Sequence, residues 1–110
     1  MQVTTLSALA DGNRLHIVEL LRGGPRTVGE ITEKLGLRQP QVSKHLRILS
    51  EAGLVEVHAV ANLRIYRLRP QGFEELDSWL ASFRQVWEER FDRLDDYLRD
   101  LQSRRSKQTD

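Results

Sequence analysis

The last third of the chain repeats apolar side chains every seven residues, and this repeat constrains the fold more than any other feature. The repeated positions are Phe73, Leu80, Trp87, Leu94 and Leu101. Leu76, Phe83 and Tyr97 occupy a companion position three residues later, which Arg90 interrupts. The spacing predicts one amphipathic helix from Gln71 to about Arg105. Such a helix would be on the order of 50 Å long at about 1.5 Å per residue. A small core cannot cover it, so part of the stripe needs another chain, most simply a second copy.

The predicted surface between two copies combines this stripe with a short first helix around Leu6 and Leu9. Its members on the last helix are Trp79, Phe83, Val86, Trp87, Arg90, Phe91, Leu94 and Leu98. The aromatic residues could also line a small-molecule pocket between helices, but this spacing is more typical of a core or dimer interface. The polar segment 106–110 is expected to fray.

Composition limits the class of protein. The chain has 110 residues, of which 39 % are hydrophobic, enough for one domain with a modest core. It has no cysteine, which excludes disulfides, thiolate metal sites and cysteine nucleophiles and suits a reducing cytoplasm. No basic lead-in precedes an apolar run at the start, and no stretch of about 18 apolar residues occurs. We therefore expect a cytoplasmic protein with no signal peptide and no membrane partner.

The net charge of +1 hides an asymmetry along the chain. Residues 37–69 include six basic and two acidic residues, whereas residues 70–110 include seven basic and ten acidic ones. A polyanionic partner would therefore bind the middle of the chain.

Helical periodicity and capping signals predict two helices before this basic region. Asp11 is a candidate N-cap for a helix with Leu15, Val18 and Leu21 on one face, stopped by the Gly-Gly-Pro segment 23–25. Segment 27–36 follows as a compact helix. Its start is a Thr27–Glu30 capping box, its stripe is Val28, Ile31 and Leu35, and Gly36 ends it.

The next helix starts after only four residues, so a steep helix-turn-helix crossing is expected. Pro40 suits its first turn, Val42, Leu46 and Leu49 form its buried stripe, and Gly53 is the expected stop. Alternating, β-branched segments at 54–60 and 64–69 then predict a hairpin whose turn is Ala61-Asn62-Leu63. The predicted fold class is mainly α with a small β-hairpin, a winged helix-turn-helix followed by a long C-terminal helix.

The helix after the turn carries a dense set of hydrogen-bonding side chains on the faces its stripe leaves free. These are Gln39, Gln41, Ser43, Lys44 and Arg47. Gln bonds adenine edges, Lys and Arg bond guanine, and such a helix fits the DNA major groove. A merely solvated polar face is the alternative. Arg64, Arg67 and Arg69 on the hairpin favour DNA because they can hold flanking phosphates or enter a minor groove. His45 borders the apolar stripe, so it either contacts DNA or is half-buried and bonded within the fold.

Three segments also resemble the winged helix-turn-helix repressors of the arsenic-repressor (ArsR) family. They are LADGNRLHIVELL, TVGEITEKLGLRQPQVSKHLRILSEAGLV and IYRLRP, and the resemblance covers about Leu6 to Pro70. The tail is similar to the autorepressor-like branch. The resemblance implies a homodimeric repressor that binds an imperfect palindrome at a promoter. It puts Gln41, Ser43, Lys44 and His45 at the groove-facing start of the recognition helix, and the wing at 55–69. The tip, VANLR, is poorer in basic residues than is usual in the family.

Metal sensing through the family's known sites is not expected. Those sites use cysteines on the third helix or Asp/His and His/Glu pairs on the last one, and here the third helix has no thiol and the last helix no histidine. No cofactor is expected, and no catalytic Ser-His-Asp order or Gly-rich phosphate loop is present, so we expect no enzyme.

The sequence therefore predicts one domain overall, with a DNA-binding region at 1–70, a dimerisation helix at 71–105 and a frayed tail at 106–110. The leading hypothesis is a homodimeric repressor that binds double-stranded DNA. A dimeric protein-interaction module that uses the acidic last helix is the alternative. A small-molecule or protein effector stays open in either case.

Overall fold

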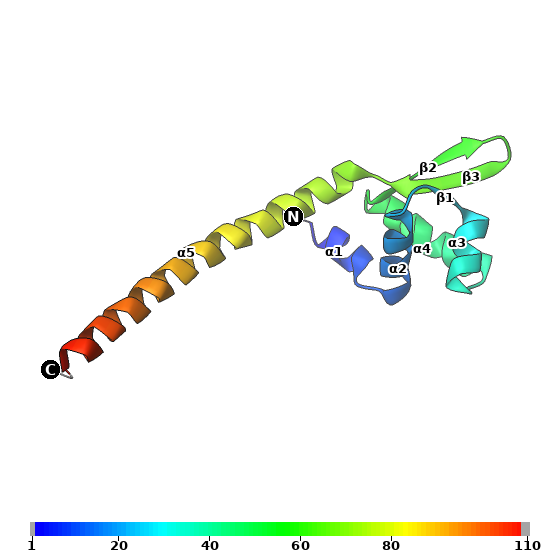
Figure 1. The fold of residues 1–110 in the computed structure, drawn as a ribbon. Helices are drawn as coiled ribbons and strands as arrows, with labels where there is room; N and C mark the ends of the chain where they lie inside the picture. Colours follow the sequence, from blue (N-terminus) through cyan, green and yellow to red (C-terminus); the bar gives the residue numbers. More distant parts are fainter. Residues whose placement is uncertain (1, 109–110) are drawn as a thin grey trace. The chain divides into compact units, whose positions relative to one another are not determined.

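A computed structural model describes residues 2–108 of the chain. In chain order the elements are α1 (Val3–Leu9), α2 (Gly12–Leu21), β1 (Arg26–Thr27), α3 (Val28–Leu35), α4 (Gln39–Glu51), β2 (Val55–Val60), β3 (Leu63–Leu68) and α5 (Pro70–Gln108) (Figure 1). The chain divides into two units, of which the first ends at Leu76 and the second begins at Asp77. The prediction of a mainly helical chain with a small β-hairpin is confirmed.

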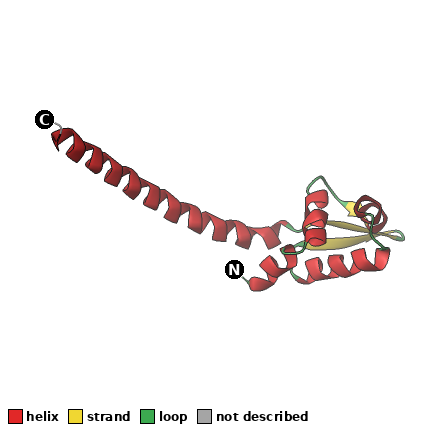
Figure 2. Cartoon of the chain, turned by 90° about the horizontal axis from the view of Figure 1, so that it is seen from below, coloured by secondary structure: helices red, strands yellow, loops and turns green. Residues whose placement is uncertain are grey.

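The sheet has three antiparallel strands in the order β1-β3-β2, and helices lie beside it (Figure 2). The hairpin of β2 and β3 was predicted, but β1 was not. Arg26 pairs with Tyr66 and Thr27 with Ile65. A strand of two residues is too short to show an alternating pattern, which is why the sequence does not predict it. Its consequence is that the start of α3 is held beside β3.

The hairpin turn is one residue shorter than predicted. Val60 pairs with Leu63, so Leu63 belongs to β3 and only Ala61 and Asn62 form the connection. Ala61 has a φ of 56°, which is left-handed. A two-residue connection with left-handed backbone follows the twist of the strands, and that match outweighs the steric cost of a Cβ at this position.

The core of the first unit comes from four helices and the start of β2. Its fully buried side chains are Ile17, Ile31, Val42, Leu46, Leu49 and Leu54. The predicted stripe of α4 is therefore confirmed. Ile31 is buried in α3, while Val28 and Leu35 are half-buried and pack against the core.

The predicted stripe of α2 was wrong in part. Leu21 is buried and Val18 packs beside the core, but Leu15 is 45 % exposed and Ile17 is buried instead. The buried face begins with Arg14, whose side-chain Nε donates to the Ala8 carbonyl at 2.7 Å. Because the first residue of this face is a charged arginine, the apolar residues of α2 alone do not show which face is buried.

The predicted caps are confirmed. Asp11 accepts hydrogen bonds from the backbone N–H groups of Asn13 and Arg14 at 2.9 and 3.1 Å. The backbone N–H of Thr27 donates to the Glu30 carboxylate, and the backbone N–H of Glu30 donates to the Thr27 hydroxyl. Gly36 ends α3 with a φ of 66°. These side chains satisfy backbone donors that a helix start leaves unpaired.

The first turns of α5 pack with the first unit, so this unit extends past residue 70, where the sequence predicts the DNA-binding region to end. Phe73 contacts the core, and Gly72 lies directly against the backbone of Gly53. The helix then continues without a break to Gln108, somewhat beyond the predicted end at Arg105. Of the segment expected to fray, residues 109–110 lie outside the described residues. Within residues 2–108 no helix is long and apolar enough to span a membrane.

Candidate nucleic-acid interface

A cleft of about 950 Å³ lies between the start of α3, the α4 helix and the hairpin. Its lining residues are Thr27, Val28, Gly29, Gln39, Pro40, Ser43, Lys44, Arg47, Ser50, Asn62, Leu63, Arg64 and Tyr66. Three of them, Lys44, Arg47 and Arg64, are basic, and none of these described residues is acidic. The cleft therefore presents a cationic, hydrogen-bonding surface, which suits a polyanion.

Five of the eight side chains predicted to bind DNA line this cleft. They are Gln39, Ser43, Lys44, Arg47 and Arg64. The buried stripe of α4 fixes this arrangement, because residues advance by about 100° per position and Val42, Leu46 and Leu49 face inward. Arg47 lies 3.6 Å from Glu51, measured from Nε to Oε1, but both side chains are well exposed. An exposed pair of this kind is weak, so Arg47 is available to a ligand.

Gln41 does not line the cleft. Its side-chain Oε1 accepts a hydrogen bond from the backbone N–H of Arg38 at 3.3 Å, so the side chain folds back over the start of α4. Gln41 therefore serves as a cap of its own helix in this structure.

His45 is directed toward the start of α2. Its side chain is only 16 % exposed, and Nδ1 lies 4.0 Å from Asp11 Oδ1 and 3.5 Å from an Arg14 guanidinium nitrogen. The pKa of Asp11 is lowered, first by the backbone N–H of Arg14 and also by the charges of Arg14 and His45. The contacts favour the interpretation of His45 as half-buried and bonded within the fold.

Arg67 also lies outside the cleft lining. It faces Glu56 across the β2–β3 ladder, and its Nε donates to Glu56 Oε1 at 2.6 Å. The Arg67 hydrogen bond lowers the pKa of the Glu56 carboxyl, and His58 contributes with its Nε2 at 3.8 Å. Arg64 is therefore the hairpin cation best placed in the cleft, whereas Arg67 already has an acidic partner.

The start of α3 contributes lining residues that were not predicted. The backbone N–H groups of Val28 and Gly29 belong to the first helical turn, which lacks carbonyl partners from a preceding turn. The pairing of β1 with β3 brings this turn to the hairpin. The only sequence signal is the Thr27–Glu30 capping box, which locates the start of the helix but not its neighbour.

The residues predicted for dimerisation divide between the two units. On α1, Leu6 is exposed, whereas Leu9 packs partly against the core, and the buried residues of α1 are Thr5 and Ala8. On α5 all eight are exposed within this chain, and the seven apolar ones range from 37 % exposed at Trp79 to 63 % at Phe91. Trp79 and Phe83 stack edge to face with ring centres 5.0 Å apart. The stripe on α5 is therefore present and uncovered in a single copy.

No three His, Asp or Glu side chains converge within residues 2–108 in a way that could hold a metal ion. His16 and His58 are both exposed.

Comparison with known proteins identifies the family. Residues 11–57 match the model of the bacterial regulatory protein arsR family. The HTH-type transcriptional regulator Rv2034 of Mycobacterium tuberculosis is 43 % identical over 76 residues, covering 69 % of this chain and 71 % of the relative. The transcriptional repressor SdpR of Bacillus subtilis is 32 % identical over 76 residues, covering 69 % of this chain and 84 % of the relative. Since these relatives are transcriptional regulators, the prediction of no enzyme is confirmed.

Comparison with solved structures points to the same family. The ArsR family transcriptional regulator RHA00566 has a TM-score of 0.69 at 28 % identity, over 77 % of this chain and 88 % of that one. The homodimeric winged helix-turn-helix DNA-binding domain Mb0332 from Mycobacterium bovis has a TM-score of 0.60 at 30 % identity, over 81 % of this chain and 80 % of that one. The winged helix-turn-helix fold is thereby confirmed, and the chain belongs to the ArsR family of bacterial regulatory proteins.

Proposed function

We propose that this protein is a homodimeric transcriptional repressor that binds an imperfect palindrome in double-stranded DNA. Each copy inserts the start of α4 into the major groove of one half-site, and the hairpin lies along the flanking backbone. The observation that carries the proposal is the cleft itself. It joins the first turns of α4 to the hairpin and includes three cations and no carboxylate.

The side chains of the cleft suggest two kinds of contact. Gln39 and Ser43 are short and uncharged, so they suit the edges of bases. Lys44, Arg47 and Arg64 suit phosphates, which position a protein on DNA without reading its sequence. The backbone N–H groups at the start of α3 can donate hydrogen bonds to a further phosphate. Contacts of Gln41 and His45 with DNA remain predictions: without DNA, Gln41 Oε1 accepts from the Arg38 backbone N–H, and His45 Nδ1 lies 4.0 Å from Asp11 Oδ1.

Two features support a dimer. The apolar stripe of α5 is uncovered in one copy, and the structural relative Mb0332 is homodimeric. Two recognition helices on a two-fold axis would reach half-sites about 34–36 Å apart, one turn of DNA. Repression would not depend on a metal at the family's known sites, because this chain has no cysteine and its last helix has no histidine.

Fluorescence anisotropy tests the proposal with a labelled duplex from upstream of the protein's own gene and a scrambled duplex of equal length. We expect tight binding of one dimer to the first duplex, unchanged by a chelator. Ser43→Ala should reduce the preference for the cognate duplex. Arg64→Ala should weaken binding to both and reduce the salt slope by about one. Arg22→Ala, which removes a charge outside the cleft, is the matched control.

The same assay tests the position of Arg67. Glu56→Gln should tighten DNA binding, most at low salt, because it removes a carboxylate from the hairpin and frees the Arg67 guanidinium.

Equal, weak binding of the parent protein to both duplexes would contradict the proposal. That result would favour a protein-interaction module built on α5.

A further inference from the structure

Arg14, near the start of α2, makes contacts with all three nitrogen atoms of its guanidinium group. Its Nε donates to the carbonyl of Ala8 at 2.7 Å, and one terminal nitrogen lies 3.4 Å from the carbonyl of Ser7. The other terminal nitrogen lies 3.5 Å from Nδ1 of His45 on α4. Ala8 lies in the last turn of α1, where a helix leaves carbonyl groups without a partner in a following turn. A single side chain of α2 therefore joins the end of α1 to α4.

His45 lies on the flank of α4 that faces away from the cleft. Because residues advance by about 100° per position, His45 is about 200° round the helix from Ser43 and from Arg47, which both line the cleft. The same flank continues with Ile48, three residues later, which lines a groove of about 330 Å³ between α1 and α4. The end of α1 and the start of α2 therefore hold α4 on the side opposite to the cleft.

The contact between Arg14 and His45 has a defined polarity. A guanidinium group can only donate hydrogen bonds, so Nδ1 of His45 accepts and carries no proton in this contact. Asp11 holds the arginine from its other end, because its Oδ1 accepts from the backbone N–H of Arg14 at 3.1 Å. No charged side chain lies three or four positions from His45 on α4, where the residues are Gln41, Val42, Ile48 and Leu49.

We propose that Arg14 and His45 are positioning residues for DNA recognition: Arg14 anchors His45 to the end of α1 and thereby fixes the rotation and depth of α4 in the major groove. The inference rests on the proposed function and adds two residues that act on it from outside the cleft. Hydrogen bonds from Gln39 or Ser43 to base edges need distances within a few tenths of an ångström. Long lysine and arginine side chains can still reach phosphates after a small displacement of α4. Loss of the anchor therefore reduces sequence preference and leaves phosphate binding in place.

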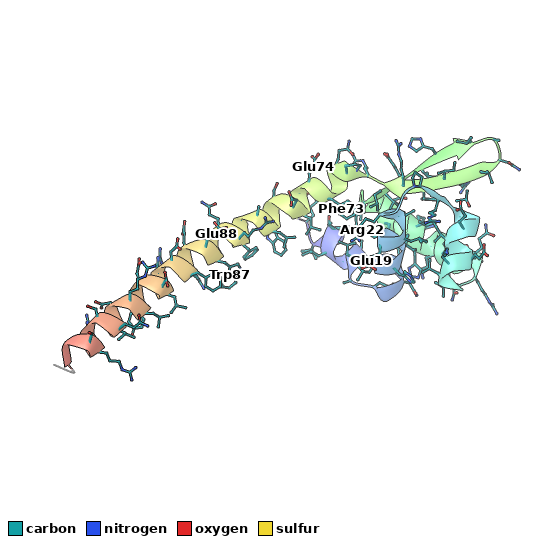
Figure 3. All side chains as sticks on the ribbon, in the orientation of Figure 1. Glu19, Arg22, Phe73, Glu74, Trp87 and Glu88 are labelled. Atoms are coloured by element: carbon teal, nitrogen blue, oxygen red, sulfur yellow. The ribbon has the colours of Figure 1, made fainter. Side chains whose placement is uncertain are left out.

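Two substitutions of each residue test the anchor. His45→Asn keeps an acceptor close to the position of Nδ1, whereas His45→Gln places its amide close to the position of Nε2 and loses that acceptor. Arg14→Lys keeps the charge but has one nitrogen atom in place of three, and Arg14→Met keeps a long side chain without a donor. Arg22→Met is the matched control, because Arg22 is exposed just beyond the end of α2 (Figure 3).

Fluorescence anisotropy gives the ratio of affinities for the cognate and scrambled duplexes, and the salt slope, for each full-length protein. The measurements are made near pH 8, above the range in which histidine side chains usually gain a proton. Partial unfolding lowers both affinities alike, so the ratio reports the position of α4 and not the stability of the protein.

We expect Arg14→Met, Arg14→Lys and His45→Gln to lower the ratio by about three- to tenfold, the effect of losing one hydrogen bond, with an unchanged salt slope. His45→Asn and Arg22→Met should keep the ratio of the parent. Arg14→Met combined with His45→Gln should lower the ratio no further than Arg14→Met alone, because the two residues act through one bond.

Direct contact of His45 with DNA predicts the opposite order. His45→Gln would then retain more preference than His45→Asn, and this result would overturn the anchor. A salt slope lowered by about one in Arg14→Met would place Arg14 itself at a phosphate and would also overturn it. An unchanged ratio in both Arg14 variants would overturn the inference and leave the repressor standing. A parent protein without preference for the cognate duplex would overturn the proposed function together with this inference.

Discussion

Gly72 is a residue whose missing side chain allows the start of α5 to pack closely against a neighbouring backbone segment. Its backbone φ is not left-handed, so any residue could adopt its conformation. A Cβ at this position, however, would overlap the carbonyl group of Gly53 and lie 3.2 Å from the Leu54 Cα. Both neighbours are backbone atoms, which cannot rotate away. Glycine is required at position 72 because no room exists there for a Cβ. Its absence allows the first turn of α5 to pack directly against the backbone of Gly53 and Leu54.

Gly72→Ala should therefore destabilise the protein by about 1–3 kcal/mol, the usual cost of overpacking. Urea unfolding followed by circular dichroism measures the change. Gly12→Ala is the matched control, because nothing lies within 4 Å of a Cβ at Gly12. It should be neutral or slightly stabilising. Equal effects of the two substitutions would show that the close approach of α5 to Gly53 is not maintained in solution.

Asp11 makes the start of α2 sensitive to acid. Its pKa is lowered below its usual value of 3.8, chiefly by the backbone N–H of Arg14. A lowered pKa means that folding favours the ionised form. The stabilising contribution is complete above the unfolded-state pKa and is lost as the pH falls through the folded-state value.

Asp11→Asn keeps a side chain that can cap the helix but does not titrate. We expect the variant to be less stable than the parent at pH 7, and the difference to shrink below about pH 4. Urea midpoints measured at a series of pH values give the comparison. A difference that stays constant down to pH 2 would mean that Asp11 ionisation makes no contribution to folding.

At the scale of elements, α2 offers the sharpest contrast between sequence pattern and structure. Ile17 is completely buried, whereas Leu15, two residues earlier, is 45 % exposed. Ile17→Ala should cost about 2–5 kcal/mol, the usual range for a large core residue. Leu15→Ala should cost less than about 1 kcal/mol, because most of its apolar area is already in water. If the two substitutions cost the same, the rotation of α2 would have to be revised.

The same contrast explains what the sequence can predict. The start of α3 and the stripe of α4 were predictable, because caps and a clean period are local signals. The two-residue β1 was not, because its pairing with β3 joins segments far apart in the chain. For the candidate site, the sequence predicted Arg64 and four of the α4 residues that line the cleft, Gln39, Ser43, Lys44 and Arg47. It could not show that Gln41, His45 and Arg67 already have partners, since those contacts depend on neighbouring turns, helices and strands.

At the scale of the whole molecule, the two units differ in whether a single copy buries their apolar side chains. The first has its own buried core, from Ala8 to Val55, whereas every described side chain from Asp77 to Ser106 is exposed in a single copy. Under the proposed function, a second copy covers this exposed apolar surface. Folding of the first unit and pairing of copies should therefore be separable by substitution.

Leu94→Glu tests this separation, since Leu94 lies in the stripe of α5 and outside the core of the first unit. We expect sedimentation to show a monomer whose Ile17-centred core unfolds at the same urea midpoint as that of the parent. Affinity for the full palindrome should fall by at least about a hundredfold, because each copy then binds one half-site without its neighbour. Gln85→Glu places the same charge on the polar side of α5 and should leave both properties unchanged. A Leu94→Glu protein that stays dimeric would mean that the copies associate through another surface, such as Leu6 on α1, and that the stripe of α5 is covered by something else.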